Sequence, residues 1–106
     1  NAKETLANWG NALKQLGQLN EARLAYRNAL EIAPENPYLY YSLGEIENSL
    51  GDANAAIVAF SQALKKGINH EAAYIVLIDL LRASGRAEEA IAWEARRAAT
   101  TAVTSP

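Results

Sequence analysis

The sequence repeats itself every 34 residues, and this period constrains the fold more than any other feature. The interval separates three glycines and then three alanines: Gly17, Gly51 and Gly85, followed by Ala22, Ala56 and Ala90. Small residues that recur at a fixed interval indicate repeated close contacts between packed elements. A period between about 20 and 50 residues is typical of a solenoid, in which similar units stack one after another.

The central copy, residues 37–67, reads as two amphipathic helices joined at Leu50-Gly51-Asp52. At the i, i+3, i+4, i+7 spacing of a helix, Tyr40, Leu43, Gly44 and Glu47 fall on one face of the first helix, and Ala56, Ala59, Phe60 and Ala63 fall on one face of the second. Gly44 and Ala56 are small enough for the two backbones to approach closely. We therefore predict that Gly44 and Ala56 face each other across this hairpin.

The same pattern predicts six helices along the chain. They are expected near residues 4–16, 20–33, 37–50, 54–66, 70–84 and 87–100. In Pro34-Glu35-Asn36-Pro37, Asn36 can cap a helix whose first position is Pro37. At the next junction, Gly67 can adopt the left-handed conformation that ends a helix, and Asn69 can cap the helix that begins near His70.

These residues resemble the tetratricopeptide repeat, whose pattern is W-x2-L-G-x2-Y, then A-x3-F, then P. The first copy has Leu6-x2-Trp9-Gly10-x2-Leu13, Ala22-x3-Tyr26 and Pro34, and the second has Tyr40-x2-Leu43-Gly44, Ala56-x3-Phe60 and Ala63. The third copy departs from the pattern with Ile78 for the glycine, Glu94 for the aromatic residue and Arg97 for the later alanine.

The resemblance implies an all-α fold, a right-handed α-solenoid of three antiparallel helix-turn-helix hairpins. It assigns the whole chain, 1–106, to one domain with repeats at about 3–36, 37–70 and 71–104. The sequence contains no methionine, so its first residue is not a translation start. We therefore expect a fragment of a longer protein.

Composition argues against several classes of function. The net charge of −2 gives no dense basic face for nucleic acid or an anionic membrane, and no apolar run approaches the roughly 20 residues of a membrane helix. No catalytic motif or metal-ligand cluster is present, and His70 reads as a surface or capping residue. We therefore expect no enzyme activity, no metal and no cofactor. Compartment stays open, with the cytoplasm as the default.

In the family that the chain resembles, a second stripe on the first helix of each copy lines a groove that binds peptides. The resemblance places these twelve positions at Glu4, Ala7, Asn11, Lys14, Tyr38, Tyr41, Glu45, Asn48, Ala72, Ile75, Asp79 and Arg82. We therefore expect a non-catalytic scaffold that binds a protein or peptide segment.

The chemistry of these stripes predicts what a partner looks like. Tyr38, Tyr41 and Ile75 suit an apolar anchor, and a basic residue of the partner would meet Glu45 and Asp79. The alternatives are that both tyrosines only pack on neighbouring helix ends and that the charges are simply solvated.

One subgroup of the family grips a C-terminal carboxylate with lysines and asparagines. Those positions fall on Ala7, Asn11, Ser42, Ala72 and Val76, so only Asn11 matches. Without cations, a carboxylate entering the groove has nothing to offset its desolvation. This binding mode is therefore not expected.

The repeats could be the scaffold of a larger enzyme. They could also self-associate through the last helix, where Ile91 or Trp93 is expected to be exposed. Trp9 is expected in the core.

Overall fold

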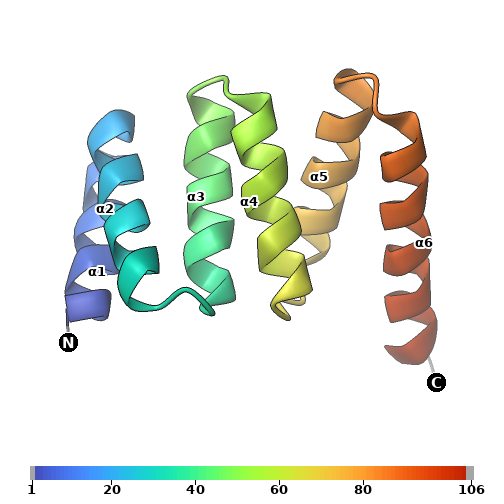
Figure 1. Cartoon of the computed structure of the whole chain (residues 1–106), viewed down its shortest axis with the longest axis horizontal. Coiled ribbons are helices and arrows are strands. Elements are labelled where there is room, and N and C mark those ends of the chain that lie inside the picture. Colours follow the sequence, from blue (N-terminus) through green and yellow to red (C-terminus); the bar gives the residue numbers. More distant parts are fainter. Residues whose placement is uncertain (1, 105–106) are drawn as a thin grey trace. The chain divides into compact units, whose positions relative to one another are not determined.

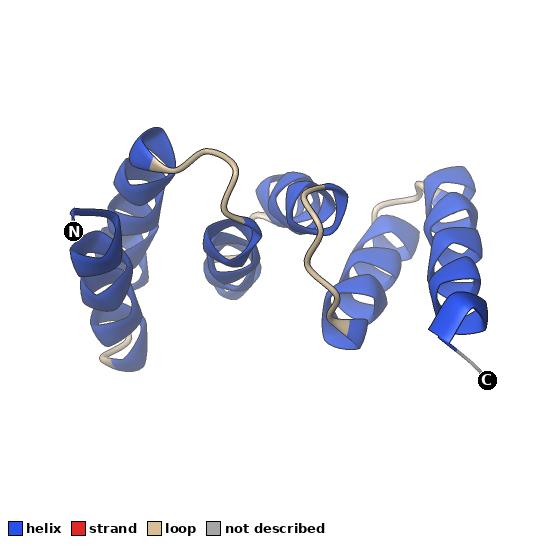
Figure 2. Cartoon of the chain, turned by 90° about the horizontal axis from the view of Figure 1, so that it is seen from below, coloured by secondary structure: helices blue, strands red, loops and turns tan. Residues whose placement is uncertain are grey.

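The structure is a computed structural model that describes residues 2–104, with side chains described for residues 5–100. Within that range it contains only α-helices and turns, as Figures 1 and 2 show. The helices are α1 (Ala2–Gln15), α2 (Leu19–Ile32), α3 (Pro37–Ser49), α4 (Ala53–Lys65), α5 (Glu71–Ala83) and α6 (Ala87–Thr104). All six predicted helices are confirmed to within a few residues at their ends. The chain divides into two compact units, residues 1–68 and 69–106, which are described separately.

The turn inside each hairpin ends its first helix in the same way. At Gly51, a φ of +83° places the backbone in the left-handed region, which a residue without a β-carbon adopts at little cost. This lets the Asp52 N–H donate to the Glu47 carbonyl at 3.0 Å and the Gly51 N–H donate to the Asn48 carbonyl at 3.1 Å. Equivalent bonds close the turns at Gly17 and Gly85, so the 34-residue period of glycines is a period of helix ends.

The helix starts agree with the sequence in part. The Asn36 side chain accepts a hydrogen bond from the Tyr38 N–H at 3.0 Å, and Pro37 is the first residue of α3, as predicted. The prediction for α5 is wrong, because His70 rather than Asn69 occupies the cap position and its side chain makes no capping bond. Asp52 caps α4 by accepting from the Ala55 N–H at 3.1 Å.

In the first unit, the core joins the α1/α2 hairpin to the α3/α4 hairpin. Small residues of α2 meet large apolar residues of α3, which lets the two helices pack closely. The buried cluster consists of Leu13, Ala22, Ala25, Tyr26, Ala29, Leu39, Leu43, Ile46 and Ala59.

Each hairpin of the first unit closes on a glycine, but the contact differs from the predicted one. A β-carbon added at Gly44 would lie 2.9 Å from Cδ1 of Phe60, and its three nearest atoms all belong to that ring. Gly44 therefore faces Phe60, and the prediction that it faces Ala56 is wrong. In the first repeat, a β-carbon at Gly10 would lie 2.7 Å from Cε2 of Tyr26. Because an aromatic ring is rigid, it cannot move aside easily, so each ring occupies the space that a β-carbon on the glycine would need.

The second unit packs differently, because Ile78 stands where the other repeats have Gly10 and Gly44. Tyr74 of α5 and Trp93 of α6 pack against each other inside the hairpin. Their rings meet edge to face, with centroids 6.2 Å apart. Arg96 also stacks on Trp93, with its guanidinium carbon 4.7 Å from the ring centroid. Trp93 is therefore buried, and of the two residues expected to be exposed on the last helix only Ile91 is.

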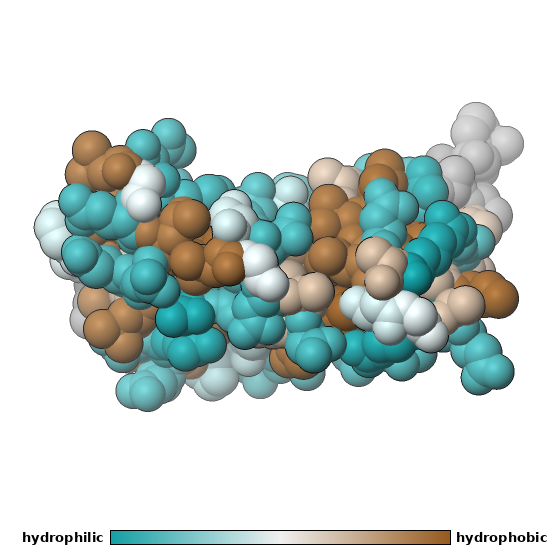
Figure 3. Space-filling view, turned by 90° about the horizontal axis from the view of Figure 1, so that it is seen from above, coloured by the Kyte–Doolittle hydropathy of each residue, from teal (hydrophilic) through white to brown (hydrophobic). Residues whose placement is uncertain are grey.

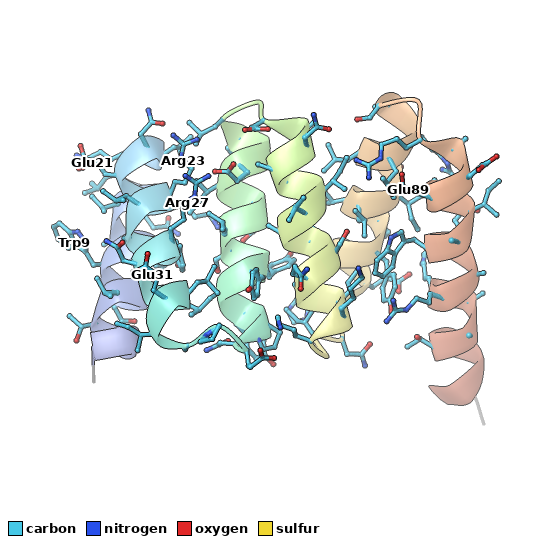
Figure 4. The ribbon with its side chains drawn as sticks, viewed as in Figure 1. Trp9, Glu21, Arg23, Arg27, Glu31 and Glu89 are labelled. Atoms are coloured by element: carbon cyan, nitrogen blue, oxygen red, sulfur yellow. The ribbon has the colours of Figure 1, made fainter. Side chains whose placement is uncertain are left out.

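Trp9 is not a core residue, contrary to the sequence-based expectation. Its side chain is 59% exposed and projects outward from α1, as Figure 4 shows. Its counterpart one repeat later, Leu43, is buried in the cluster that includes Ala25 and Ala29 of α2. The periodicity identified a packing face correctly, but among the described residues of the first unit no helix covers that face of α1.

We predict that Gly44→Ala destabilises the protein by about 1–3 kcal/mol, because the added methyl group collides with the Phe60 ring, and that Gly44→Leu costs more. Denaturant unfolding measures the change. A helical Gly→Ala change without such a collision stabilises by roughly 0.5–1 kcal/mol. In a Phe60→Leu background the cost should therefore shrink or change sign. An unchanged midpoint for Gly44→Leu would contradict the close approach.

Candidate functional site

In the first unit, the predicted groove residues lie in two stripes, one on α1 and one on α3, and the two stripes are side by side. We call these the first-helix stripes. The Lys14 ammonium donates to Oε1 of Glu45 at 2.9 Å, which joins the two helices across 31 residues of sequence. The pair is half-buried. A basic group of a partner that meets Glu45 therefore competes with Lys14. Ala7 and Asn11 lie on the same stripe of α1, Ala7 half-buried and Asn11 exposed.

The two tyrosines of the α3 stripe have different surroundings. Tyr38 is 61% exposed. Tyr41 is half-buried and meets Phe60 edge to face, with ring centroids 5.7 Å apart. Burial raises the pKa of Tyr41 above its ordinary value; the Glu45 carboxylate raises it further, and the Lys14 ammonium opposes both. Tyr41 is therefore a neutral, partly packed ring at the edge of the stripe.

The second unit contains a pocket of about 680 Å³ between α5 and α6. It is lined by Glu71, Ile75, Ile78, Asp79, Arg82, Glu94, Arg97 and Ala98. Three of these, Ile75, Asp79 and Arg82, are predicted groove residues. Three others, Ile78, Glu94 and Arg97, are the departures of the third repeat from the pattern. The pocket lies where a glycine and an aromatic ring would otherwise close the hairpin.

Ion pairs brace the walls of this pocket. Arg82 of α5 pairs with Glu94 of α6, and Glu71 of α5 pairs with Arg97 of α6. Asp79 differs from these groups, because it makes no hydrogen bond or ion pair with any residue in the described part of the chain. The pocket therefore combines the apolar side chains of Ile75 and Ile78 with one uncompensated carboxylate.

The remaining predicted positions lie outside these contacts. Asn48 is exposed on α3, and Ala72 is exposed on α5 but does not line the pocket. The side chain of Glu4 lies outside the described residues. Sequence reasoning missed the contribution of α6, although Glu94 and Arg97 were already visible as departures from the repeat pattern.

The described part of the chain contains neither a cluster of metal-binding side chains nor a helix suited to crossing a membrane. No group of three or more histidine, cysteine or acidic side chains is placed to hold a metal ion. None of the helices in residues 2–104 has the length and apolar character needed to cross a membrane. On the face shown in Figure 3, apolar surface occurs in separate clusters among hydrophilic atoms.

Comparison with known proteins identifies the fold family. A family model described as TPR repeat matches residues 10–48, and one described as tetratricopeptide repeat matches residues 49–103. The chain belongs to the tetratricopeptide repeat family. A search of curated proteins finds no significant match.

Solved structures of tetratricopeptide repeat proteins share the fold. YrrB, described as a TPR protein with an unusual peptide-binding site, is 23% identical with a TM-score of 0.78, over 86% of this chain and 47% of its own. MamA is 22% identical with a TM-score of 0.78, over 86% of this chain and 53% of its own. The first TPR of Spaghetti (RPAP3), bound to an HSP90 peptide, is 22% identical with a TM-score of 0.73, over 89% of this chain and 76% of its own. This chain thus spans about half the length of YrrB and MamA.

We predict that Tyr41 titrates above the ordinary tyrosine pKa of about 10. Because the folded pKa is raised, its contribution to stability is fully present below the unfolded pKa and is lost as the pH rises through the folded pKa. The free energy of unfolding should therefore fall more steeply at alkaline pH in the parent protein than in Tyr41→Phe.

Tyrosinate absorbance measures this pKa directly. The chain has 5 tyrosines, so the titration curve of Tyr41→Phe is subtracted from that of the parent protein. Glu45→Gln serves as a control. It should lower the midpoint of the difference curve, because the Glu45 carboxylate is one of the two causes that raise the pKa of Tyr41. A midpoint at or below about 10 in the parent protein would contradict the burial of this ring.

Proposed function

We propose that this chain is a non-catalytic interaction module that binds a peptide or protein segment on the stripes of its first helices. The observation that carries the proposal is the α5/α6 pocket, where Ile75 and Ile78 lie beside the Asp79 carboxylate, which pairs with none of the described side chains. An aliphatic or aromatic side chain of a partner would fill the pocket, and a neighbouring lysine or arginine would pair with Asp79. YrrB and the Spaghetti repeat, whose descriptions name peptides, support this reading by analogy of fold.

The first unit offers a second contact surface of the same character. Tyr38 and Tyr41 supply aromatic area, which contributes most of the energy in many interfaces. Glu45 supplies a carboxylate, but its pair with Lys14 must rearrange before it meets a partner's cation. We therefore assign the aromatic residues to affinity and the charged ones to register and association rate.

The binding test uses a peptide selected from a random library on the immobilised chain and then titrated at two salt concentrations. Ile75→Ala or Tyr41→Ala should weaken binding by about 1 kcal/mol or more at either salt concentration, because apolar contacts are little affected by screening. Asp79→Asn and Glu45→Gln should weaken it at low salt and have little effect near physiological ionic strength.

The matched control is Leu24→Ala on α2, which removes an exposed apolar side chain away from the stripes. It should bind like the parent protein. If both Ile75→Ala and Tyr41→Ala bind like the parent protein while Leu24→Ala does not, the first-helix stripes are not the binding surface.

Self-association through α6 is a second candidate, because Ile91 is 64% exposed on that helix. Light scattering at increasing protein concentration should show a larger species for the parent protein and only monomer for Ile91→Arg, since a charge is costly to bury in an apolar contact. A parent protein that stays monomeric at every concentration rules this candidate out.

Because the chain spans about half of YrrB and MamA, a role as the scaffold of a larger enzyme remains a third proposal, tested by assay of the full-length gene product.

A further inference from the structure

A second pocket lies in the first unit, where α2, α3 and α4 meet. Its volume is about 240 Å³. Pockets that hold drug-sized ligands have about 300–1,000 Å³, so this pocket suits one side chain of a partner. It is lined by Arg27 of α2, by Tyr40, Leu43 and Glu47 of α3, and by Ala55, Val58 and Ala59 of α4.

The pocket opens on a different face of α3 from the first-helix stripe. Glu47 follows Glu45 by two residues, which places it about 200° around the helix. The carboxylate oxygens of Glu47 are buried, so a ligand in the pocket does not reach them. What a ligand meets is the apolar wall and the side chain of Arg27.

The apolar wall is formed mainly by aliphatic side chains. Leu43 and Ala59 are buried, Ala55 is half-buried, and Val58 is 61% exposed at the rim. An aliphatic side chain of a partner that enters the pocket would remove its own apolar surface and that of Val58 from water, which favours binding.

Arg27 is the polar group at the rim of the pocket. Its side chain is 54% exposed, and its Nη2 is 3.7 Å from Oε1 of Glu47, which is too long for a hydrogen bond. No residue in the described part of the chain accepts a hydrogen bond from Arg27, and Glu31, one turn further along α2, forms no ion pair with it. A guanidinium has five N–H donors, so Arg27 can face Glu47 and still donate to a partner.

The charges around Glu47 do not balance. Arg23 and Arg27 both extend from α2 toward α3, as Figure 4 shows, and Nε of Arg23 is 3.6 Å from the same Oε1. One carboxylate therefore faces two guanidinium groups, which leaves one positive charge in excess. Arg27 is the more exposed of the two arginines, so the excess charge favours an anionic group at the rim of the pocket.

The repeats of the chain show that the fold does not require these arginines. The counterparts of Arg23 and Arg27 one repeat later are Ile57 and Ser61. An uncharged side chain is therefore compatible with a helix at either position, and the excess charge is a local property of the pocket.

We propose that this pocket binds an aliphatic side chain of a partner segment that carries an aspartate or glutamate close by. The aliphatic side chain packs against Leu43, Val58 and Ala59, and the carboxylate accepts hydrogen bonds from the exposed N–H groups of Arg27. In an extended segment, residues two apart lie on the same face and about 7 Å from each other. The sequence leucine-x-glutamate would therefore present both groups to the site.

The charge preference of this site is opposite to that of the α5/α6 pocket. There, Asp79 favours a basic residue beside the apolar side chain of a partner. Here, a lysine or arginine beside the aliphatic side chain would meet the excess positive charge, and like charges repel. The two pockets should therefore select different partner segments.

The test uses the capped tripeptide acetyl-Leu-Ala-Glu-amide, with the Leu-Ala-Gln, Leu-Ala-Lys and Ala-Ala-Glu tripeptides as matched probes. Methyl NMR spectra of the chain follow Leu43, Ala55, Val58 and Ala59 during each titration. At low salt we expect saturable shifts with Leu-Ala-Glu and about tenfold weaker binding of Leu-Ala-Gln, because a charged hydrogen bond is lost. Leu-Ala-Lys and Ala-Ala-Glu should also bind more weakly than Leu-Ala-Glu.

Two variants test the two parts of the site. Arg27→Ser introduces the residue found one repeat later and leaves Arg23 to pair with Glu47, so it should fold, as circular dichroism would verify. It should bind Leu-Ala-Glu and Leu-Ala-Gln equally. Val58→Ser should weaken every leucine tripeptide by about threefold or more, because apolar contact is lost.

The matched control is Leu24→Ser, because Leu24 is the counterpart of Val58 one repeat earlier. Its side chain is 60% exposed and does not line the pocket. This variant should bind all the tripeptides like the parent protein.

Three results for the parent protein would overturn the proposal, whether or not Arg27→Ser folds. The first is equal affinity for Leu-Ala-Glu and Leu-Ala-Gln at low salt, and the second is tighter binding of Leu-Ala-Lys. The third is a shift of the same methyl groups when the chain is concentrated without peptide, because a second copy would then fill the pocket.

Discussion

The close approach of two helices over a glycine is the contact on which the first unit depends. At Gly10 and Gly44 an aromatic ring of the second helix occupies the space that a β-carbon would need. This contact sets the separation of the helices in each hairpin, and the small residues of α2 then let α3 pack against it. Removing the free space at one glycine would therefore disturb both packing layers.

The third repeat shows what happens when that contact is absent. Ile78 replaces the glycine and Glu94 replaces the aromatic residue, so α5 and α6 cannot close in the same way. Tyr74 and Trp93 fill one part of the hairpin, and the α5/α6 pocket, braced by ion pairs, forms beside them. Departure from the repeat pattern thus creates the surface on which the proposed function rests.

Glu47 is a second departure with a local consequence. A carboxylate in place of an apolar or aromatic side chain introduces a buried charge that forms ion pairs with Arg23 and Arg27 but accepts no hydrogen bond from the described residues. Such a group lowers stability unless a donor reaches it.

The sequence alone determined the number, order and approximate ends of the helices, because a 34-residue period of glycine helix ends and 3.6-residue apolar spacing are local properties of the chain. It also placed Ile75, Asp79 and Arg82 on one stripe. Only the tertiary structure decided that Gly44 meets Phe60, that Trp9 is exposed, that Lys14 engages Glu45, and that α6 supplies a wall of the α5/α6 pocket. Periodicity shows which face of a helix packs, but the contacts of each residue depend on whether another element covers that face and on how closely it approaches.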